Sequence, residues 1–157
     1  MIGEVSYNVR KAFVNALNDG NINVNGVVIP VYSEQVPQNE TVADVTYKNQ
    51  KGKAYIIIQG QFENESGEQT MCNYTLNSYI SIRIVTTFVS GGRKDIAEHI
   101  SDQVYKALFY DWRNTKVTSD EVSIQDVRIE PTNFTFENAG NQTAYTKILT
   151  FNTIINL

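Results

Sequence analysis

The segment with the strongest fold signal is "CNYTLNSYISIRIVTTFV", residues 72–89. Large apolar residues recur at alternate positions along it, and mostly polar residues separate them. Because side chains of a strand point alternately to its two faces, the pattern predicts one long strand with one buried face. The other face is expected to be solvated or to line an interface. The predicted buried residues are Tyr74, Leu76, Ile80, Ile82, Ile84 and Phe88.

Two segments show helical spacing instead. Residues 3–18 and 93–110 each carry apolar residues three and four positions apart, which predicts two helices with one apolar face each. Asp19-Gly20 ends the first helix, with Gly20 expected as a left-handed cap. The apolar residues are Val5, Val9, Ala12, Phe13, Ala16 and Leu17 in the first helix, and Ile96, Ala97, Ile100, Val104, Ala107, Leu108 and Phe109 in the second.

Further strands are predicted on both sides of the long one. Asn25-Gly26 is typical of a two-residue hairpin turn. Residues 54–64 read as a strand in which Ala54, Ile56, Ile58 and Phe62 share one face and Gly60 marks a bulge or close packing. The last two strands are predicted over 121–138 and 143–157, and a phase change after Ile124 predicts a bulge in the first.

These elements predict an α+β domain of two layers spanning residues 1–157. Strands joined by short turns are most simply antiparallel, so we expect a mainly antiparallel sheet. Two helices that are each apolar on one side would pack on one face of that sheet.

Residues 38–53 are polar and show little periodicity, which predicts a long loop. Long loops in compact domains are usually functional or disordered. Val42, Val45 and Tyr47 are unusual for a fully solvated loop, so we expect a partner to cover part of it.

The composition argues against several function classes. The net charge of −4 does not favour tight nucleic-acid binding. Cys72 and His99 are the only residues of their kinds, so neither a disulfide nor a Cys- or His-rich metal site is predicted. No run of about 18 apolar residues predicts a membrane span, and no signal-peptide pattern opens the chain. Chance therefore explains the five N-x-S/T triplets better than glycosylation; they begin at Asn39, Asn64, Asn73, Asn133 and Asn141.

Four places in the sequence carry residues typical of catalytic or ligand-binding motifs. Gly91-Gly92-Arg93-Lys94 follows a strand and precedes a helix, as a phosphate cradle would, but it matches neither nucleotide-binding glycine pattern. A plain turn is favoured, and the two cations at the helix start should have an anionic neighbour. His99 and Cys72 lack motif partners, which favours a surface and a half-buried role over catalysis. "ENESGE" at 63–68 does not match a calcium loop.

"ALFYDWR" gathers three aromatic residues and an arginine near the end of the second helix. Tyr, Trp and Arg are enriched at interface centres, so Tyr110, Trp112 and Arg113 could anchor a partner. The edge of the core is an equally good interpretation.

The element order and three motifs resemble the phage tail-terminator and tail-completion proteins, including related head–tail joining and neck proteins. The first motif is Pro30-Val31-Tyr32 with Pro37, and the second is Tyr55-Ile56-Ile57-Ile58. The third is the helical series Ala97, Ile100, Val104, Ala107 and Leu108, which follows a long strand and a glycine-containing turn.

This resemblance implies a non-enzymatic virion protein without cofactor or metal. It would form a ring, commonly a hexamer, at the head-proximal end of the tail, ending tail-tube growth and joining tail to head. Its partners would be further copies, the tail-tube protein and head–tail connector proteins. DNA would pass through the lumen without specific binding, and assembly would occur in the host cytoplasm without a membrane. The alternatives are a connector or neck ring subunit, a small-ligand or peptide-binding α+β module, and an enzyme using His99 or Cys72.

Interface contacts are predicted for the loop 38–53, the turn 63–71, the end of the second helix and one arginine of the long strand. The residues are Val42, Val45, Tyr47, Lys48, Arg83, Arg93, Lys94, Tyr110, Trp112 and Arg113.

Overall fold

The computed structural model describes residues 2–34, 36–37, 41–65, 75–88, 94–111, 114–139 and 142–156. Predictions for Asn39, Cys72–Tyr74, Gly91–Arg93, Trp112–Arg113 and Asn141 fall outside these ranges. The elements are α1 (Ile2–Asp19), β1 (Asn23–Val24), β2 (Val27–Val28), β3 (Val31–Tyr32), β4 (Asp44–Tyr47), β5 (Gln50–Glu65), β6 (Thr75–Phe88), α2 (Lys94–Leu108), β7 (Ser123–Ile129), β8 (Asn133–Ala139) and β9 (Gln142–Asn156).

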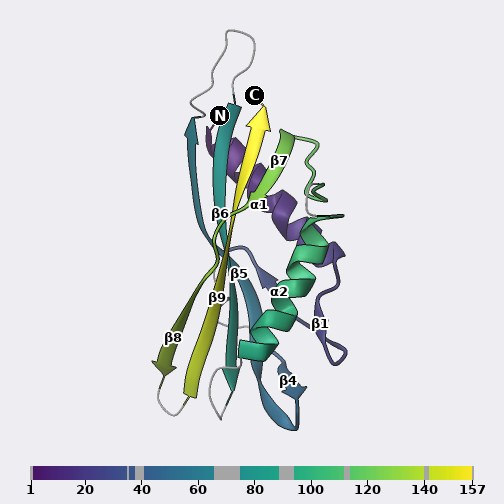
Figure 1. Ribbon diagram of the computed structural model, residues 1–157, viewed down its shortest axis with the longest axis vertical. Helices are drawn as coiled ribbons and strands as arrows, with labels where there is room; N and C mark the ends of the chain where they lie inside the picture. Colours follow the sequence, from purple (N-terminus) through teal and green to yellow (C-terminus); the bar gives the residue numbers. More distant parts are fainter. Residues whose placement is uncertain are drawn as a thin grey trace.

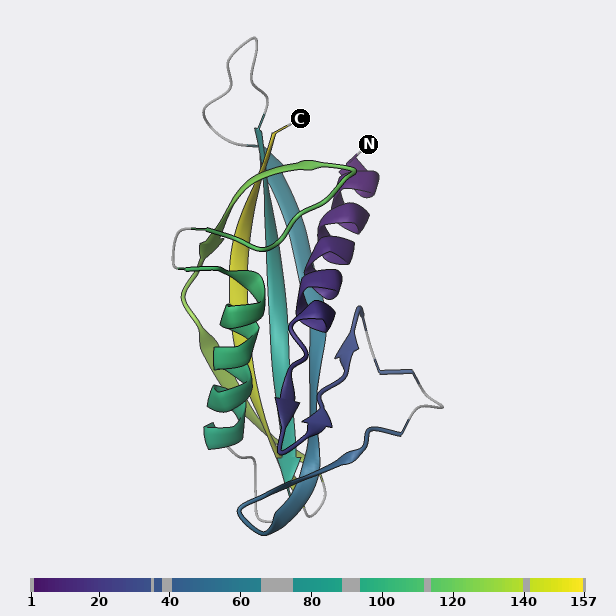
Figure 2. The ribbon, with the colours of Figure 1, turned by 90° about the vertical axis from the view of Figure 1, so that its right-hand side faces the viewer.

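The main sheet has seven strands in the order β3-β5-β6-β9-β7, with β4 also pairing to β5 and β8 also pairing to β9. All of its neighbouring strands are antiparallel except β3 and β5, which run parallel. The prediction of one strand over 121–138 is wrong, because this segment forms two strands, β7 and β8, which pair with different parts of β9. The strands form one long twisted sheet, and both helices lie against the same side of it (Figures 1 and 2). The α+β prediction of two layers is therefore confirmed. We call the covered side of the sheet the helix face and the opposite side the outer face.

The predicted alternation of β6 is confirmed. Every second residue from Leu76 to Phe88 is buried, and the residues between them are partly exposed. The buried series includes Ser78 and Thr86, so the helix face is not wholly apolar. Strand β9 contributes the matching buried residues Tyr145, Leu149, Phe151 and Ile155. Burying one such large apolar side chain stabilises the fold by about 1.5–3 kcal/mol. Because β6 and β9 each bury several of them, these two central strands contribute much of the stability of the core.

Helix α1 is held against α2 by a close approach at its end. A Cβ atom on Gly20 would lie 2.4 Å from the Cβ of Ala107, so no larger residue fits there without movement. The left-handed residue is Asn21, with φ of 47°. The prediction of a left-handed Gly20 is therefore wrong: this glycine is needed because two helices meet, whereas Asn tolerates the left-handed turn that follows.

Bulges occur in both predicted places, and one of them moves a side chain. The pairing of β5 with β6 shifts between Ile58 and Gly60, and that of β7 with β9 shifts between Ile124 and Asp126. The extra residue in β5 reverses the alternation after it. The assignment of Phe62 to the face of Ile58 is therefore wrong; Phe62 lies on the outer face, 58% exposed.

The loop predicted over 38–53 is wrong for its second half. Residues Asp44–Tyr47 and Gln50–Glu65 form a hairpin whose turn residues, Lys48 and Asn49, have φ of 47° and 64°. Two left-handed residues suit the twist of a tight hairpin. The sequence did not predict β4, because the segment is polar and because β4 pairs with residues 50–53, which belong to the same polar segment.

Val42 and Val45 are buried by the chain itself. Val45 is 1% exposed and belongs to the main core. Val42 packs with Tyr32 and Ile57 in a small cluster beside β3. Their apolar character therefore needs no partner to explain it. The expectation that a partner covers these two valines was the reason for assigning them to an interface, and that reason is wrong.

Candidate functional site

The predicted interface residues that the structure describes do not form one site. Apart from the two buried valines, Tyr47 and Lys48 lie at the β4–β5 turn, and Lys94 lies at the start of α2. Arg83 lies on the outer face and Tyr110 just beyond the other end of α2.

The β4–β5 turn and the start of α2 are joined by a contact between charges. Lys48 Nζ lies 3.4 Å from Asp95 Oδ2 and 5.4 Å from the centre of the Tyr47 ring. Asp95 sits in the first turn of α2, where the helix dipole favours an anion. Lys94 is exposed beside it. An anion from the same chain thus already lies next to this cationic helix start.

Arg83 stands in the middle of the outer face. It pairs with Ile57 on one side and Ile148 on the other, and it is partly exposed. Within the described residues no ion pair to Arg83 is found.

The two aromatic residues after α2 have different environments. Phe109 is buried and its ring lies 6.1 Å from that of Phe151. Tyr110 is 75% exposed, and Lys116 Nζ lies 5.2 Å from its ring centre. The edge-of-core interpretation is therefore correct for Phe109, whereas Tyr110 remains a predicted contact residue.

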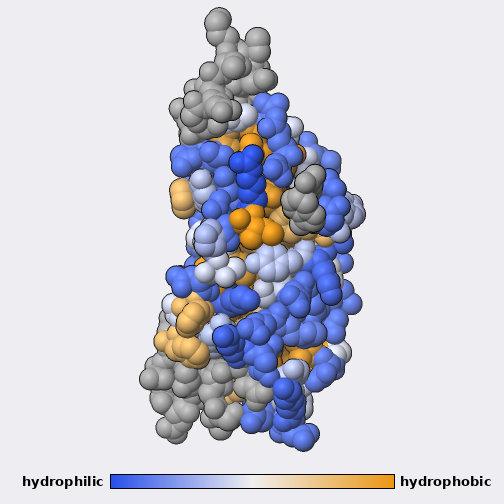
Figure 3. Space-filling view, viewed as in Figure 1, coloured by the Kyte–Doolittle hydropathy of each residue, from blue (hydrophilic) through white to orange (hydrophobic). Residues whose placement is uncertain are grey.

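Two exposed aromatic groups were not predicted from the sequence. On the outer face Phe62 stacks on Tyr79, with ring centres 4.7 Å apart. On the helix face Phe134 and Phe136 of β8 flank Tyr145 at 6.0 and 4.9 Å, yet remain 56% and 57% exposed. We call these two residues the β8 aromatic pair. Figure 3 shows a largely hydrophilic surface with hydrophobic side chains gathered over β8.

The alternating "FTF" of β8 was the available signal for the pair. Its exposure was not predictable, because it results from α2 packing mainly against β6 and β9. Burial raises the pKa of the Tyr145 hydroxyl that the pair flanks, and the Glu98 carboxylate of α2 raises that pKa further. Burial and then Asp102 raise the pKa of Tyr105 in the same way.

The sheet has an unpaired border on each side. Strand β4 pairs with β5 from Gln50 to Lys53, and β3 pairs with β5 at Ile56 and Ile57. No described strand pairs with that border of β5 from Ile58 to Glu65, which we call the β5 edge. On the opposite side β7 and β8 pair only with β9, so their outer borders are also unpaired in the described part of the chain. Unpaired strand edges expose backbone groups that readily pair with another chain.

A groove of about 380 Å³ runs beside the β5 edge. Gln61 donates from Nε2 to the backbone oxygen of Ser6 at 2.8 Å, and Arg10 pairs with Glu34 at 2.6 Å. These contacts tie α1 and the segment after β3 to the rim. The groove is lined by Ser6, Arg10, Glu34, Ile58, Gln59, Gly60 and Gln61.

Of His99 and Cys72, the two candidate catalytic residues, only His99 lies within the described ranges. His99 is an exposed residue of α2. The described residues contain no group of three or more His, Cys, Asp or Glu side chains that could hold a metal ion. Among the described helices, none combines the length and the hydropathy needed to cross a membrane.

No family profile and no curated protein matches the sequence. Among solved structures, the chain is similar to a chain from the virion of a native gene transfer agent (GTA) particle. That similarity has a TM-score of 0.62 at 13% identity and covers 97% of this chain and 100% of the other. At this identity the similarity shows a shared fold over the whole domain.

Proposed function

We propose that this protein is a non-enzymatic structural component of a phage-like virion. The observation that carries the proposal is the shared fold with a virion chain over nearly the full length of both chains. A shared fold alone does not define a function. The unpaired β5 edge and the exposed Phe62 on that strand add features that suit a protein held between others.

The specific role that we propose is a ring, most simply a hexamer, at the head-proximal end of the tail. Such a ring would end tail-tube growth and join the tail to the head, with tail-tube and connector proteins as neighbours. The motifs at Pro30–Tyr32, Tyr55–Ile58 and along α2 support this role through their resemblance to tail terminators. The net charge of −4 would let DNA pass without tight binding.

The location is tested by purifying particles and identifying their proteins by mass spectrometry. We expect the protein in intact virions and in isolated tails, at a fixed copy number per particle. Its absence from purified particles that are otherwise complete would refute the virion role.

The terminator role is tested by producing particles without this protein. Unjoined tails of irregular length are expected, because tube growth would have no stop. Tails of normal length beside DNA-filled heads would instead assign the protein to the connector or neck ring.

A further inference from the structure

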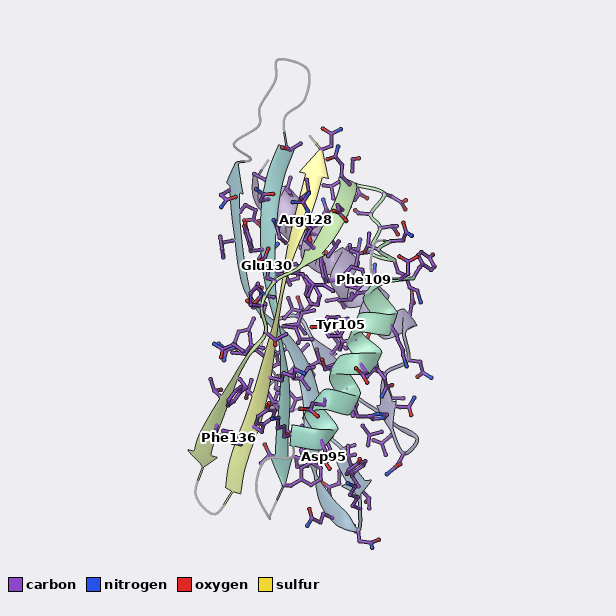
Figure 4. The ribbon with its side chains drawn as sticks, viewed as in Figure 1. Asp95, Tyr105, Phe109, Arg128, Glu130 and Phe136 are labelled. Atoms are coloured by element: carbon purple, nitrogen blue, oxygen red, sulfur yellow. The ribbon has the colours of Figure 1, made fainter. Side chains whose placement is uncertain are left out.

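Two unpaired edges, the β5 edge and the outer border of β7, lie on opposite sides of the sheet at the same height along the strands. We call residues level when they are linked by pairing across neighbouring strands. Following the pairing across the strands, Phe62 of β5 is level with Tyr79, then with Asn152, and finally with Arg128 of β7. In the next row Gln61 is level with Ile80, Phe151 and Ile129. The β5 edge and β7 therefore occupy the same half of the sheet, the half where Figure 4 places Arg128 and Glu130.

Their directions also match. Each of the pairs β5–β6, β6–β9 and β9–β7 is antiparallel, so β7 runs opposite to β5. A second copy placed beside the first by rotation about an axis along the strands would bring its β7 against the β5 edge. The two strands would be antiparallel, and both helix layers would lie on the same side, so neither copy has to be turned over.

We propose that β7 of one copy pairs with the β5 edge of the next copy, with Phe62 opposite Arg128. This deepens the proposed function and rests on it, since it takes the partner to be a second copy of this chain. The contact uses different surfaces on the two copies, and contacts of that type close into rings when the rotation permits. Adding a strand to an unpaired edge is a common mode of recognition between chains.

The side chains at these levels suit the pairing. Ile129 is level with Gln61, lies on the helix face and is 50% exposed. In the paired register it would enter the groove beside Ile58 and Gln61. On the outer face the guanidinium of Arg128 would lie beside the exposed Phe62 ring, a favourable contact for a cation and an aromatic face.

Strand β8 is a poorer candidate for the same edge. It pairs with Gln142–Ile148 of β9, which are level with the half of the sheet where β3 and β4 already cover β5. In Figure 4 Phe136 lies at the opposite end of the sheet from Arg128. A ring without a rise between copies would therefore place β8 against covered strands.

Disulfide trapping tests the register. The double variant Phe62→Cys/Arg128→Cys, in a Cys72→Ser background, would bring two Cβ atoms to within about 4.5–5.5 Å, close enough for bonding after small adjustments. We expect oxidation to give a ladder of covalent multimers that a reductant removes. The control pair Phe62→Cys/Thr135→Cys should stay monomeric on denaturing gels. Crosslinking by Phe62→Cys alone would show β5 pairing with itself, and a double variant that does not crosslink would reject the register.

A charge substitution tests the edge whatever the register. Ile129→Lys should weaken association at least about tenfold, as expected when an interface centre is disrupted. Phe134→Lys, at a similarly exposed apolar position on β8, should leave association unchanged. Sedimentation measures both, and circular dichroism confirms folding. If Phe134→Lys dissociates the assembly and Ile129→Lys does not, the proposed edge is wrong.

Both tests are to be made on purified protein and on particles assembled from the variants. Particles that contain the double variant without crosslinks would reject the pairing and leave the virion role intact. Crosslinked multimers that never enter particles would support the pairing and reject the virion role.

Discussion

The helix face and the outer face of the sheet are built from the same strands but differ in burial. On β6 the residues of the helix face are buried in an unbroken series, whereas those of the outer face are all partly exposed. The helix face is covered by α1 and α2, and it holds most of the large buried side chains. The outer face carries Arg83, Tyr79 and many hydroxyl and amide side chains. The difference indicates that the helix face supplies most of the stability of the domain, whereas much of the outer face is left uncovered by the described residues.

The largest expected effect on stability comes from replacing an isoleucine by alanine on the helix face, compared with the same replacement on the outer face. Ile82→Ala, at a fully buried position of the helix face, should lower the free energy of unfolding by about 2–5 kcal/mol, because it leaves a cavity. Ile148→Ala lies on the outer face of the neighbouring strand, where Ile148 is partly exposed, and should cost clearly less. Urea denaturation measures both variants. Equal losses would show that the outer face is as important for stability as the core.

A smaller effect is expected where the helix layer is tightest. Gly20→Ala would place a methyl group 2.4 Å from the Ala107 Cβ and should destabilise the fold by about 1–3 kcal/mol. Ala107→Gly makes room for that methyl group, so adding it should recover part of the loss in a double-mutant cycle. Purely additive losses in the thermal unfolding of the four proteins would contradict a direct contact.

A still smaller effect is expected from the pH dependence of stability at Tyr145, which lies at the border of the region that the helices cover. The raised pKa of Tyr145 means that the folded chain holds the phenol proton more tightly than the unfolded chain does. Its contribution to stability is therefore complete below the unfolded pKa of about 10 and is lost as the pH rises through that value and the folded pKa. Denaturation at several alkaline pH values should show a shallower decline for Tyr145→Phe than for the wild type. Identical slopes would contradict this, and Tyr110→Phe is the control at an exposed tyrosine.

The smallest effect on stability is expected on the outer face. Arg83→Gln should change the free energy of unfolding by no more than about 0.5 kcal/mol, since no described ion pair is lost. If the outer face serves contacts, the same variant should enter particles less efficiently than the wild type, as measured by its copy number in purified virions. A large loss of stability would instead make Arg83 part of the fold.

Much of the fold could be predicted because its signals are local. The alternation of 72–89, the helical spacing of 93–110 and the phase change after Ile124 all reappear as β6, α2 and a bulge. The hairpin at residues 44–53 was missed because its strands are short of apolar residues and its pairing is visible only in three dimensions. The candidate contact surfaces were predicted less well, since exposure depends on what the helices leave uncovered.

The sequence alone determined which residues are apolar on one side of each element, because that side follows from the repeat of a strand or a helix. The tertiary structure decided where those sides end up. A single extra residue in β5 turned Phe62 outward, and packing between helices accounted for Gly20. The unpaired β5 edge is the clearest such case. Whether a strand has a second neighbour depends on segments far away in the chain, and no local pattern records it.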